Sequence, residues 1–168
     1  MSAALRRCPW GDSTPEYRRY HDEEWGRPVV DDRAIYERLV LEGFQSGLSW
    51  LTILRKRDNF RAAFANFEID AVARFGARDV KRLLKDAGIV RHRGKIEAAI
   101  ANAKAAAALD VPLAGLIWSH APTGRRRAPR TLAELPALTP ESTALSKDLK
   151  RRGFRFVGPT TPQACMAA

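Results

Sequence analysis

The sequence predicts an all-α protein with a single domain, and two observations support this. Apolar residues recur at helical spacing in several separate segments, whereas the period-two alternation of a half-buried strand stands out nowhere. A chain of 168 residues with 45% hydrophobic content can bury one substantial core and leaves little room for a second. We therefore treat 1–168 as one domain.

Residues 1–30 are predicted to form an irregular N-terminal arm, because aromatic and charged residues crowd 8–30 and three prolines interrupt any long helix. The first helix is expected to begin near Asp32, a suitable cap, and to end near Gly43. Ser46 or Ser49 then opens a second helix. Apolar spacing predicts further helices over 60–67, 69–75, 79–86, 94–109 and 140–152.

The charge of the chain favours a polyanionic partner. Lys and Arg total 29 against 19 Asp and Glu, so the formal net charge is +10 and nucleic acid is the leading candidate, with a merely solvated basic surface as the equal alternative. The three arginines within 121–129, a predicted exposed loop, are more often solvated than functional. We expect a cytoplasmic protein, since neither a signal peptide nor an apolar run of ~20 residues is present.

Glu42 is the most informative acid, because it shares a helical face with Ile35 and Leu39 and should point inward. A buried carboxylate needs a partner, which makes it a candidate for ligand recognition or proton transfer. A salt bridge to Arg38 is the structural alternative, and spacing slightly favours it.

Aromatic residues are concentrated in the first third of the chain, which suits a pocket that stacks on a flat or cationic ring. The alternative is that they belong to the core, most of all Tyr36. The aromatic candidates for such a pocket are Trp10, Tyr17, Tyr20, Trp25 and Trp50.

Two further features are weaker when taken alone. Cys8 and His21 are suitable zinc ligands, but two ligands do not make a tetrahedral site. The predicted helix over 140–152 meets a turn with Gly153 and Gly158, which resembles a helix-hairpin-helix element that holds DNA phosphates. An ordinary turn is the alternative, and little chain remains for the second helix.

The motifs that run in order along the chain resemble the 3-methyladenine DNA glycosylase I family. The resemblance covers nearly the whole chain to Thr161. It is carried by the stretches 7–10 (RCPW), 20–26 (YHDEEWG), 41–50 (LEGFQSGLSW), 86–96 (DAGIVRHRGKI) and 153–161 (GFRFVGPTT).

This resemblance implies a helix-hairpin-helix glycosylase fold, with a partial hairpin element over 145–161. It also implies a monomeric, monofunctional enzyme that hydrolyses the N-glycosidic bond of 3-methyladenine in double-stranded DNA. Glu42 would bind the flipped base between the aromatic residues named above, and Leu48 would sit near the gap left in the duplex. DNA contacts are expected at Gly153, Val157, Gly158 and Thr160.

The family also implies a structural zinc, whose first two ligands match Cys8 and His21. After Thr161 the family pattern continues with an aromatic-rich helix and a ligand tail, whereas this sequence continues differently and looks truncated or altered. We therefore expect zinc to be absent or weakly held. The alternative function is a truncated, catalytically weak DNA-binding remnant of the same family.

Overall fold

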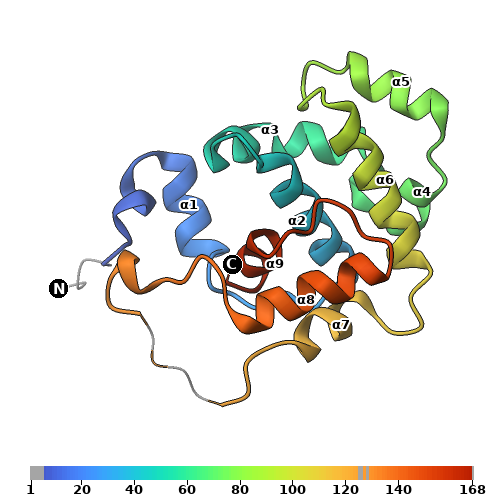
Figure 1. The fold of residues 1–168 in the computed structure, drawn as a ribbon. Coiled ribbons are helices and arrows are strands. Elements are labelled where there is room, and N and C mark those ends of the chain that lie inside the picture. The colour runs from blue at the N-terminus through green and yellow to red at the C-terminus, as the bar shows by residue number, and fades with distance from the viewer. Residues whose placement is uncertain (1–5, 125–126, 128, 168) are drawn as a thin grey trace.

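The computed structural model describes residues 6–124, 127 and 129–167, and this part of the chain is all-helical, without strands, as predicted. Figure 1 shows the helices α1 to α9 arranged around α2, with α1 and α5 at opposite ends of the view. Their bounds are α1 Pro15–Glu23, α2 Asp32–Gln45, α3 Trp50–Ala63, α4 Ile69–Ala73, α5 Ala77–Lys85, α6 Arg93–Ala107, α7 Leu113–Ser119, α8 Pro140–Arg151 and α9 Thr160–Ala167.

Helix α2 is the centre of the core, because it packs against α3, α6, α7 and α9 and exposes little of its surface. Tyr36 is fully buried there, and its hydroxyl donates a hydrogen bond of 2.7 Å to the carbonyl of Ala99 in α6. Tyr36 is therefore a core residue, as the structural alternative proposed. Burial of the apolar side chains on α2 supplies the main stabilising free energy at this point.

The beginning and the end of α2 both differ from prediction. Asp31 is the cap, since its carboxylate accepts the amide of Ala34. Asp32 instead accepts the amides of Leu113 and Ala114, at 3.1 and 2.8 Å, and so ties α2 to the start of α7. Gly43 lies inside the helix, because packing on both sides holds α2 helical as far as Gln45.

Helix α3 begins as predicted, with the Ser49 hydroxyl accepting the amide of Thr52. The prediction of a separate helix over 60–67 is wrong, because α3 continues to Ala63. A short 3-10 turn, Ala65–Phe67, follows it with φ angles of 50 to 57°. This left-handed turn brings Phe67 back into the core, where its ring stacks on Phe64 at 5.8 Å. Burial of the ring offsets the backbone strain.

The predicted irregular arm contains a regular helix, which corrects the interpretation of 1–30. Helix α1 begins with Pro15 at its first position, where the missing amide is not needed, and the Thr14 hydroxyl accepts the amide of Tyr17. A 3-10 turn, Pro9–Asp12, precedes it. Two of the prolines that suggested irregularity therefore start helical turns, and Pro28 follows the end of α1.

The C-terminal segment also differs from prediction, because α9 forms a second helix after α8. Thr139 caps α8 by accepting the amide of Ser142. The eight residues of α9 pack against α2 and α8, and Cys165 is only 3% exposed. Burial against α2 explains why so short a segment is helical.

The remaining predictions correspond to α4, α5, α6 and α8 with ends shifted by one or a few residues. The α7 helix was not predicted. Of the arginine run in 121–129, Arg125 and Arg126 lie outside the described residues, and Arg127 is exposed. None of the described helices is long and apolar enough to span a membrane.

Candidate active site

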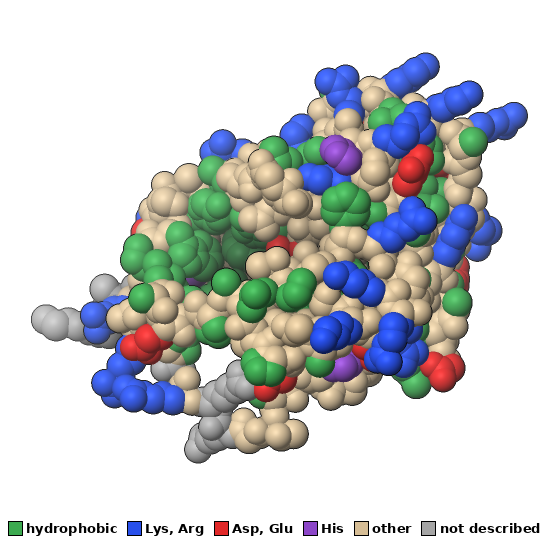
Figure 2. Space-filling view, in the orientation of Figure 1, with side chains coloured by type: hydrophobic (Ala, Val, Ile, Leu, Met, Phe, Trp, Pro, Cys, Tyr) green, Lys and Arg blue, Asp and Glu red, His purple; other side chains and the backbone are tan. Residues whose placement is uncertain are grey.

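A cavity of about 250 Å³ lies between α1, the start of α3 and the C-terminal half of α2. Figure 2 shows a hollow on this side of the molecule with hydrophobic side chains gathered around it. The cavity brings together all five predicted aromatic residues and the predicted acid. Its lining is Trp10, Tyr17, Tyr20, Trp25, Glu42, Gln45, Trp50 and Ala164.

The aromatic rings of the lining pack against one another. The ring of Trp10 lies 5.7 Å from Tyr17 and 5.5 Å from Trp25, with interplanar angles of 72° and 83°. Tyr20 and Trp50 form a second pair at 5.7 Å. Such pairs favour fixed ring orientations, so the cavity walls are held in place before a ligand enters.

Hydrogen bonds fix the elements that carry these rings. The hydroxyl of Tyr17 in α1 accepts the amide of Leu51 at 3.0 Å, which satisfies a free amide at the start of α3 and joins the two helices. Trp10 comes from the 3-10 turn before α1, and Trp50 is the first residue of α3. The short elements of residues 1–30 therefore place four aromatic residues at the cavity, and the start of α3 adds Trp50.

Glu42 is the only acid in this lining, and its carboxyl group has a strongly shifted pKa. Burial raises the pKa of Glu42 from 4.5 to about 7, and attraction to the Arg38 guanidinium lowers it in part. Arg38 therefore acts on Glu42 through its charge, and Glu42 lines the cavity. A positive ligand there would stabilise the ionised form.

Two polar groups accompany Glu42. Burial and the negative charge of Glu42 raise the pKa of Tyr20 to about 12, so its hydroxyl stays protonated. The indole nitrogen of Trp50 is buried and has no hydrogen-bond partner among the described residues. An unpaired buried donor is unfavourable, so a ligand that offers an acceptor would gain from meeting it.

Tyr20 and Trp50 also line a second cavity of about 500 Å³. This second cavity is bordered mainly by charged side chains that are paired. Arg57 donates two hydrogen bonds of 2.6 and 2.8 Å to Glu24, and Arg61 lies 2.7 Å from Glu37. Its paired charges therefore join α1, α2 and α3.

The predicted DNA-contacting residues lie in two turns. Leu48 is 40% exposed in the α2–α3 turn, directly after Gly47 with its φ of +81°. In the α8–α9 turn Gly153 has a φ of +91°, and Thr160 begins α9. The side chain of Val157 is only 1% exposed, so only its backbone is available for a contact.

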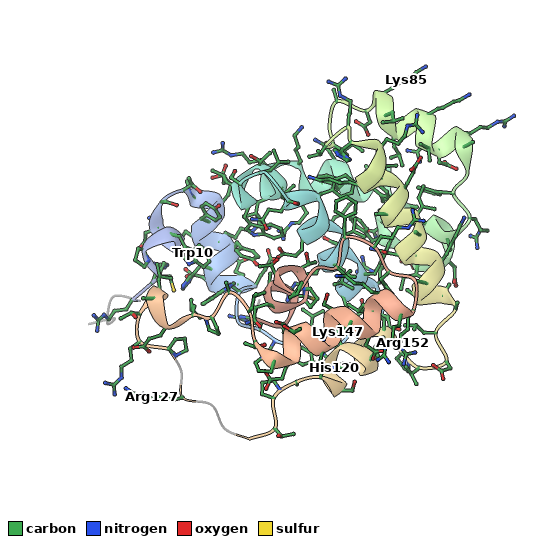
Figure 3. All side chains as sticks on the ribbon, in the orientation of Figure 1. Trp10, Lys85, His120, Arg127, Lys147 and Arg152 are labelled. Atoms are coloured by element: carbon green, nitrogen blue, oxygen red, sulfur yellow. The ribbon has the colours of Figure 1, made fainter. Side chains whose placement is uncertain are left out.

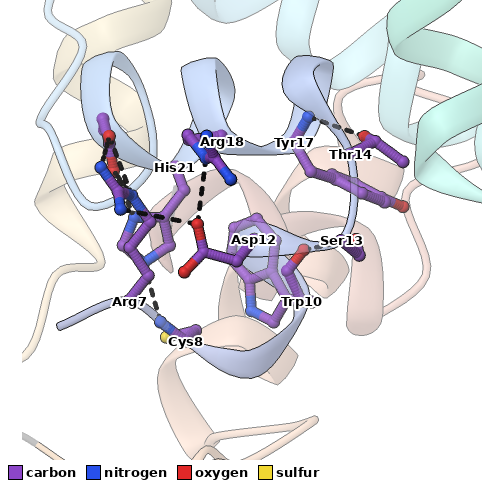
Figure 4. Close-up of polar contacts among 10 residues, drawn as sticks. Arg7, Cys8, Trp10, Asp12, Ser13, Thr14, Tyr17, Arg18 and His21 are labelled. Atoms are coloured by element: carbon purple, nitrogen blue, oxygen red, sulfur yellow. Dashed lines mark hydrogen bonds and ion pairs between the residues drawn. The ribbon is translucent and has the colours of Figure 1, made fainter.

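The two predicted zinc ligands lie close together, as Figure 4 shows. The amide of Cys8 donates to Nε2 of His21 at 3.3 Å, and Nδ1 of the same ring lies 3.1 Å from Asp22. Both ring nitrogens are therefore occupied. Cys165 is not a third ligand, because its buried thiol lies near Arg38 and Glu42, and burial raises its pKa to about 12. The described residues contain no group of three or more potential ligands, so they do not fit a tetrahedral zinc.

Two lining residues were missed by the sequence analysis. Gln45 lies three residues after Glu42 on the same helical face, so the spacing that selected Glu42 could have selected it as well. Ala164 could not have been found, because it lies in α9, which was not expected to form.

Comparisons with known proteins identify relatives of this chain. The family model for methyladenine glycosylase matches residues 10–168. DNA-3-methyladenine glycosylase 1 of Escherichia coli (strain K12) is 46% identical over 170 residues, which is 98% of this chain and 90% of that protein.

Solved structures give the same result. A crystal structure of 3-methyladenine DNA glycosylase I has a TM-score of 0.93 at 44% identity, covering 97% of this chain and 92% of that one. A structure on 3-methyladenine recognition by the glycosylase I of Staphylococcus aureus has a TM-score of 0.89 at 35% identity, covering 99% and 90%. Together with the near full-length match of the sequence, these likenesses place the chain in the methyladenine glycosylase family.

Proposed function

We propose that this protein excises 3-methyladenine from alkylated double-stranded DNA by hydrolysing its N-glycosidic bond. The observation that carries the proposal is a half-buried carboxyl group with a raised pKa, Glu42, in a cavity walled by aromatic rings. Adenine methylated at N3 is positively charged within DNA, and both aromatic faces and a carboxylate attract a cationic ring. The matched proteins act on the same base, according to their names.

Cleavage of the N-glycosidic bond of a cationic base needs little catalysis from the protein beyond selection of that base. A cationic base is already a good leaving group, so the enzyme has to flip it, hold it and allow water to reach the sugar. The described cavity lining contains no lysine that could act as a covalent nucleophile. We therefore assign Glu42 to base recognition, with Trp10, Tyr17, Tyr20, Trp25 and Trp50 as the walls that stack on or enclose the base.

DNA is held, in this proposal, by the α8–α9 turn and the start of α9, which act as a helix-hairpin-helix element. Backbone amides near Gly158 and Thr160, at the start of α9, would bind phosphate as at other helix N-termini, and such contacts carry no sequence preference. Leu48, exposed in the α2–α3 turn, enters the gap that the flipped base leaves.

The test is release of free 3-methyladenine from methylated duplex DNA by wild-type protein and by Glu42→Ala. The variant loses excision but keeps salt-sensitive binding to unmethylated duplex, because Glu42 contacts the base and not phosphate. A matched control is Glu97→Ala, which removes an exposed acid from α6. Equal excision by wild type and Glu42→Ala would refute the assignment.

The alternative of a weak DNA-binding remnant is not favoured, because the aromatic cavity is complete and the family match is nearly full-length. Zinc remains a separate question. We propose that it is absent or weakly held, since the described residues bring no three potential ligands together. Metal analysis that finds one tightly bound zinc per purified chain would contradict this. The monomeric state and cytoplasmic location stay predictions from the sequence.

A further inference from the structure

Phe156 is an unusual residue in the α8–α9 turn. Its φ angle is +54°, which side chains with a β-carbon rarely adopt, and it is 44% exposed although it is a large apolar residue. Its neighbours Phe154 and Val157 are only 3% and 1% exposed. The turn therefore buries the apolar side chains on either side of 155–156 and presents Phe156 outward, at a cost in backbone strain.

Hydrogen bonds from α6 and α8 hold the turn in this conformation. The amide side chain of Asn102 accepts the Arg155 N–H at 2.7 Å and donates to the Arg155 carbonyl at 3.0 Å. The hydroxyl of Ser146 donates to the carbonyl of Val157 at 2.6 Å. Because both flanks of Phe156 are fixed, its left-handed backbone is part of the folded structure, and its ring stays at the surface.

Phe156 lies beside the residue that follows Glu42. Its β-carbon is 3.5 Å from the place where a side chain on Gly43 would begin. Its ring also meets His92 edge to face, with centroids 6.5 Å apart. Phe156 is therefore held beside the helical turn that carries Glu42, and it does not belong to the lining of the aromatic cavity.

The surroundings of this ring are cationic. Arg155 precedes Phe156, and Arg91 and Arg93 flank His92; all three are exposed. Figure 2 shows Lys and Arg side chains gathered over α5 and α8 on the side where the hollow opens. An exposed apolar ring among cations beside a base-binding cavity fits a nucleic-acid duplex, where cations meet phosphate and apolar side chains pack against sugars and base steps.

We propose that Phe156 is a DNA-contacting residue, whose ring packs against the duplex next to the flipped nucleotide. This inference rests on the proposed function and adds an apolar contact to the backbone contacts of the turn. Because Phe156 lies against Gly43, the residue after Glu42, the protein would contact the duplex and the flipped base at neighbouring positions.

The test compares Phe156→Gly, Phe156→Tyr and wild type in two binding measurements. Phe156→Gly removes the ring at a position whose φ angle suits glycine, and should weaken binding to methylated duplex about tenfold. Its affinity for free 3-methyladenine, followed by quenching of tryptophan fluorescence, should not change. Phe156→Tyr keeps the ring and restores duplex binding. Val111→Ala is the control, because Val111 is 43% exposed in the α6–α7 connection.

Two outcomes would overturn the inference. Unchanged duplex binding by Phe156→Gly would show that the ring makes no useful contact. An equal loss of duplex and free-base binding would show a structural role instead. Failure of the proposed function is distinguishable, because wild type would then release no 3-methyladenine, whereas the effect of Phe156 variants on duplex binding would remain measurable.

Discussion

The ionisation of Glu42 affects the stability of the folded protein and, in the proposed function, the binding of the base. Its raised pKa means that ionisation is unfavourable in the folded protein, so this group contributes less stability as pH rises from 4.5 through about 7. A cationic base in the cavity would favour the ionised form and offset that cost. The inward direction of Glu42 followed from helical spacing, but its pKa depends on burial by α1, α3 and α9, which the sequence alone did not give.

The pH dependence of excision should report this group. We expect kcat/KM to rise with pH through about 7, as Glu42 loses its proton in the free enzyme, and then to level off. Glu42→Gln keeps the shape of the side chain but should remove the rise of kcat/KM with pH. Steady-state rates between pH 5.5 and 8.5 check it, and a rise that persists in Glu42→Gln would assign the titration to another group.

The substitution Glu42→Gln should raise the free energy of unfolding although it lowers excision activity. Glu42→Gln removes a carboxyl group that is costly to ionise, so its free energy of unfolding should exceed that of wild type above pH 7 and approach it near pH 5. Urea denaturation at the two pH values measures the difference. A variant that is less stable at pH 8 would show that ionised Glu42 is well paired in the folded protein.

At the scale of elements, the C-terminal end of α2 depends on a lysine from α6. The ammonium group of Lys95 donates to the carbonyls of Phe44 and Ser46, at 3.0 and 2.6 Å, and burial lowers its pKa. It thereby satisfies carbonyls that the helix leaves free and places positive charge at the helix C-terminus. The segment it holds, 44–46, lies between Glu42 and Leu48.

Lys95→Met should therefore affect both folding and excision. Two carbonyls lose their charged partner, so we expect the free energy of unfolding to fall by about 1–3 kcal/mol. Excision should fall as well, because the turn after Glu42 loses its fixed position. Lys104→Met on the exposed face of α6 is the matched control. If Lys95→Met were destabilised but fully active, Lys95 would stabilise the fold without affecting excision.

The elements that the sequence missed share a physical reason. Helix α1 sits among prolines, α7 has only seven residues, and α9 has eight residues with little polar contrast between its faces. Each becomes helical through contacts with distant parts of the chain, such as the bonds from Asp32 to the first amides of α7. Local patterns predict long amphipathic helices well, whereas short helices depend on tertiary packing.

On the scale of the whole molecule, the net charge of +10 is distributed unevenly. Around the second cavity arginines are paired with glutamates, whereas α8 and α5 carry exposed cations on the face of the molecule where the hollow opens. Figure 3 labels Lys147 on α8 and Lys85 on α5. The composition favours a partner of negative charge, whereas the distribution of the cations over the surface depends on the fold.

Duplex binding should consequently weaken with salt, while binding of free 3-methyladenine should change little. Lys147→Ala is expected to lower the slope of log Kd against log salt concentration by about 1, because one phosphate contact is lost. Titrations of unmethylated duplex at several salt concentrations measure this. An unchanged slope would place Lys147 outside the DNA-contacting surface.

The presence of Tyr20 and Trp50 in two linings has one more consequence. These two residues line both a cavity of about 250 Å³ and one of about 500 Å³. A shorter side chain at either position would therefore change the shape of both spaces at once. A substitution there would alter the surroundings of the paired charges in the larger cavity as well as the stacking surface in the smaller one.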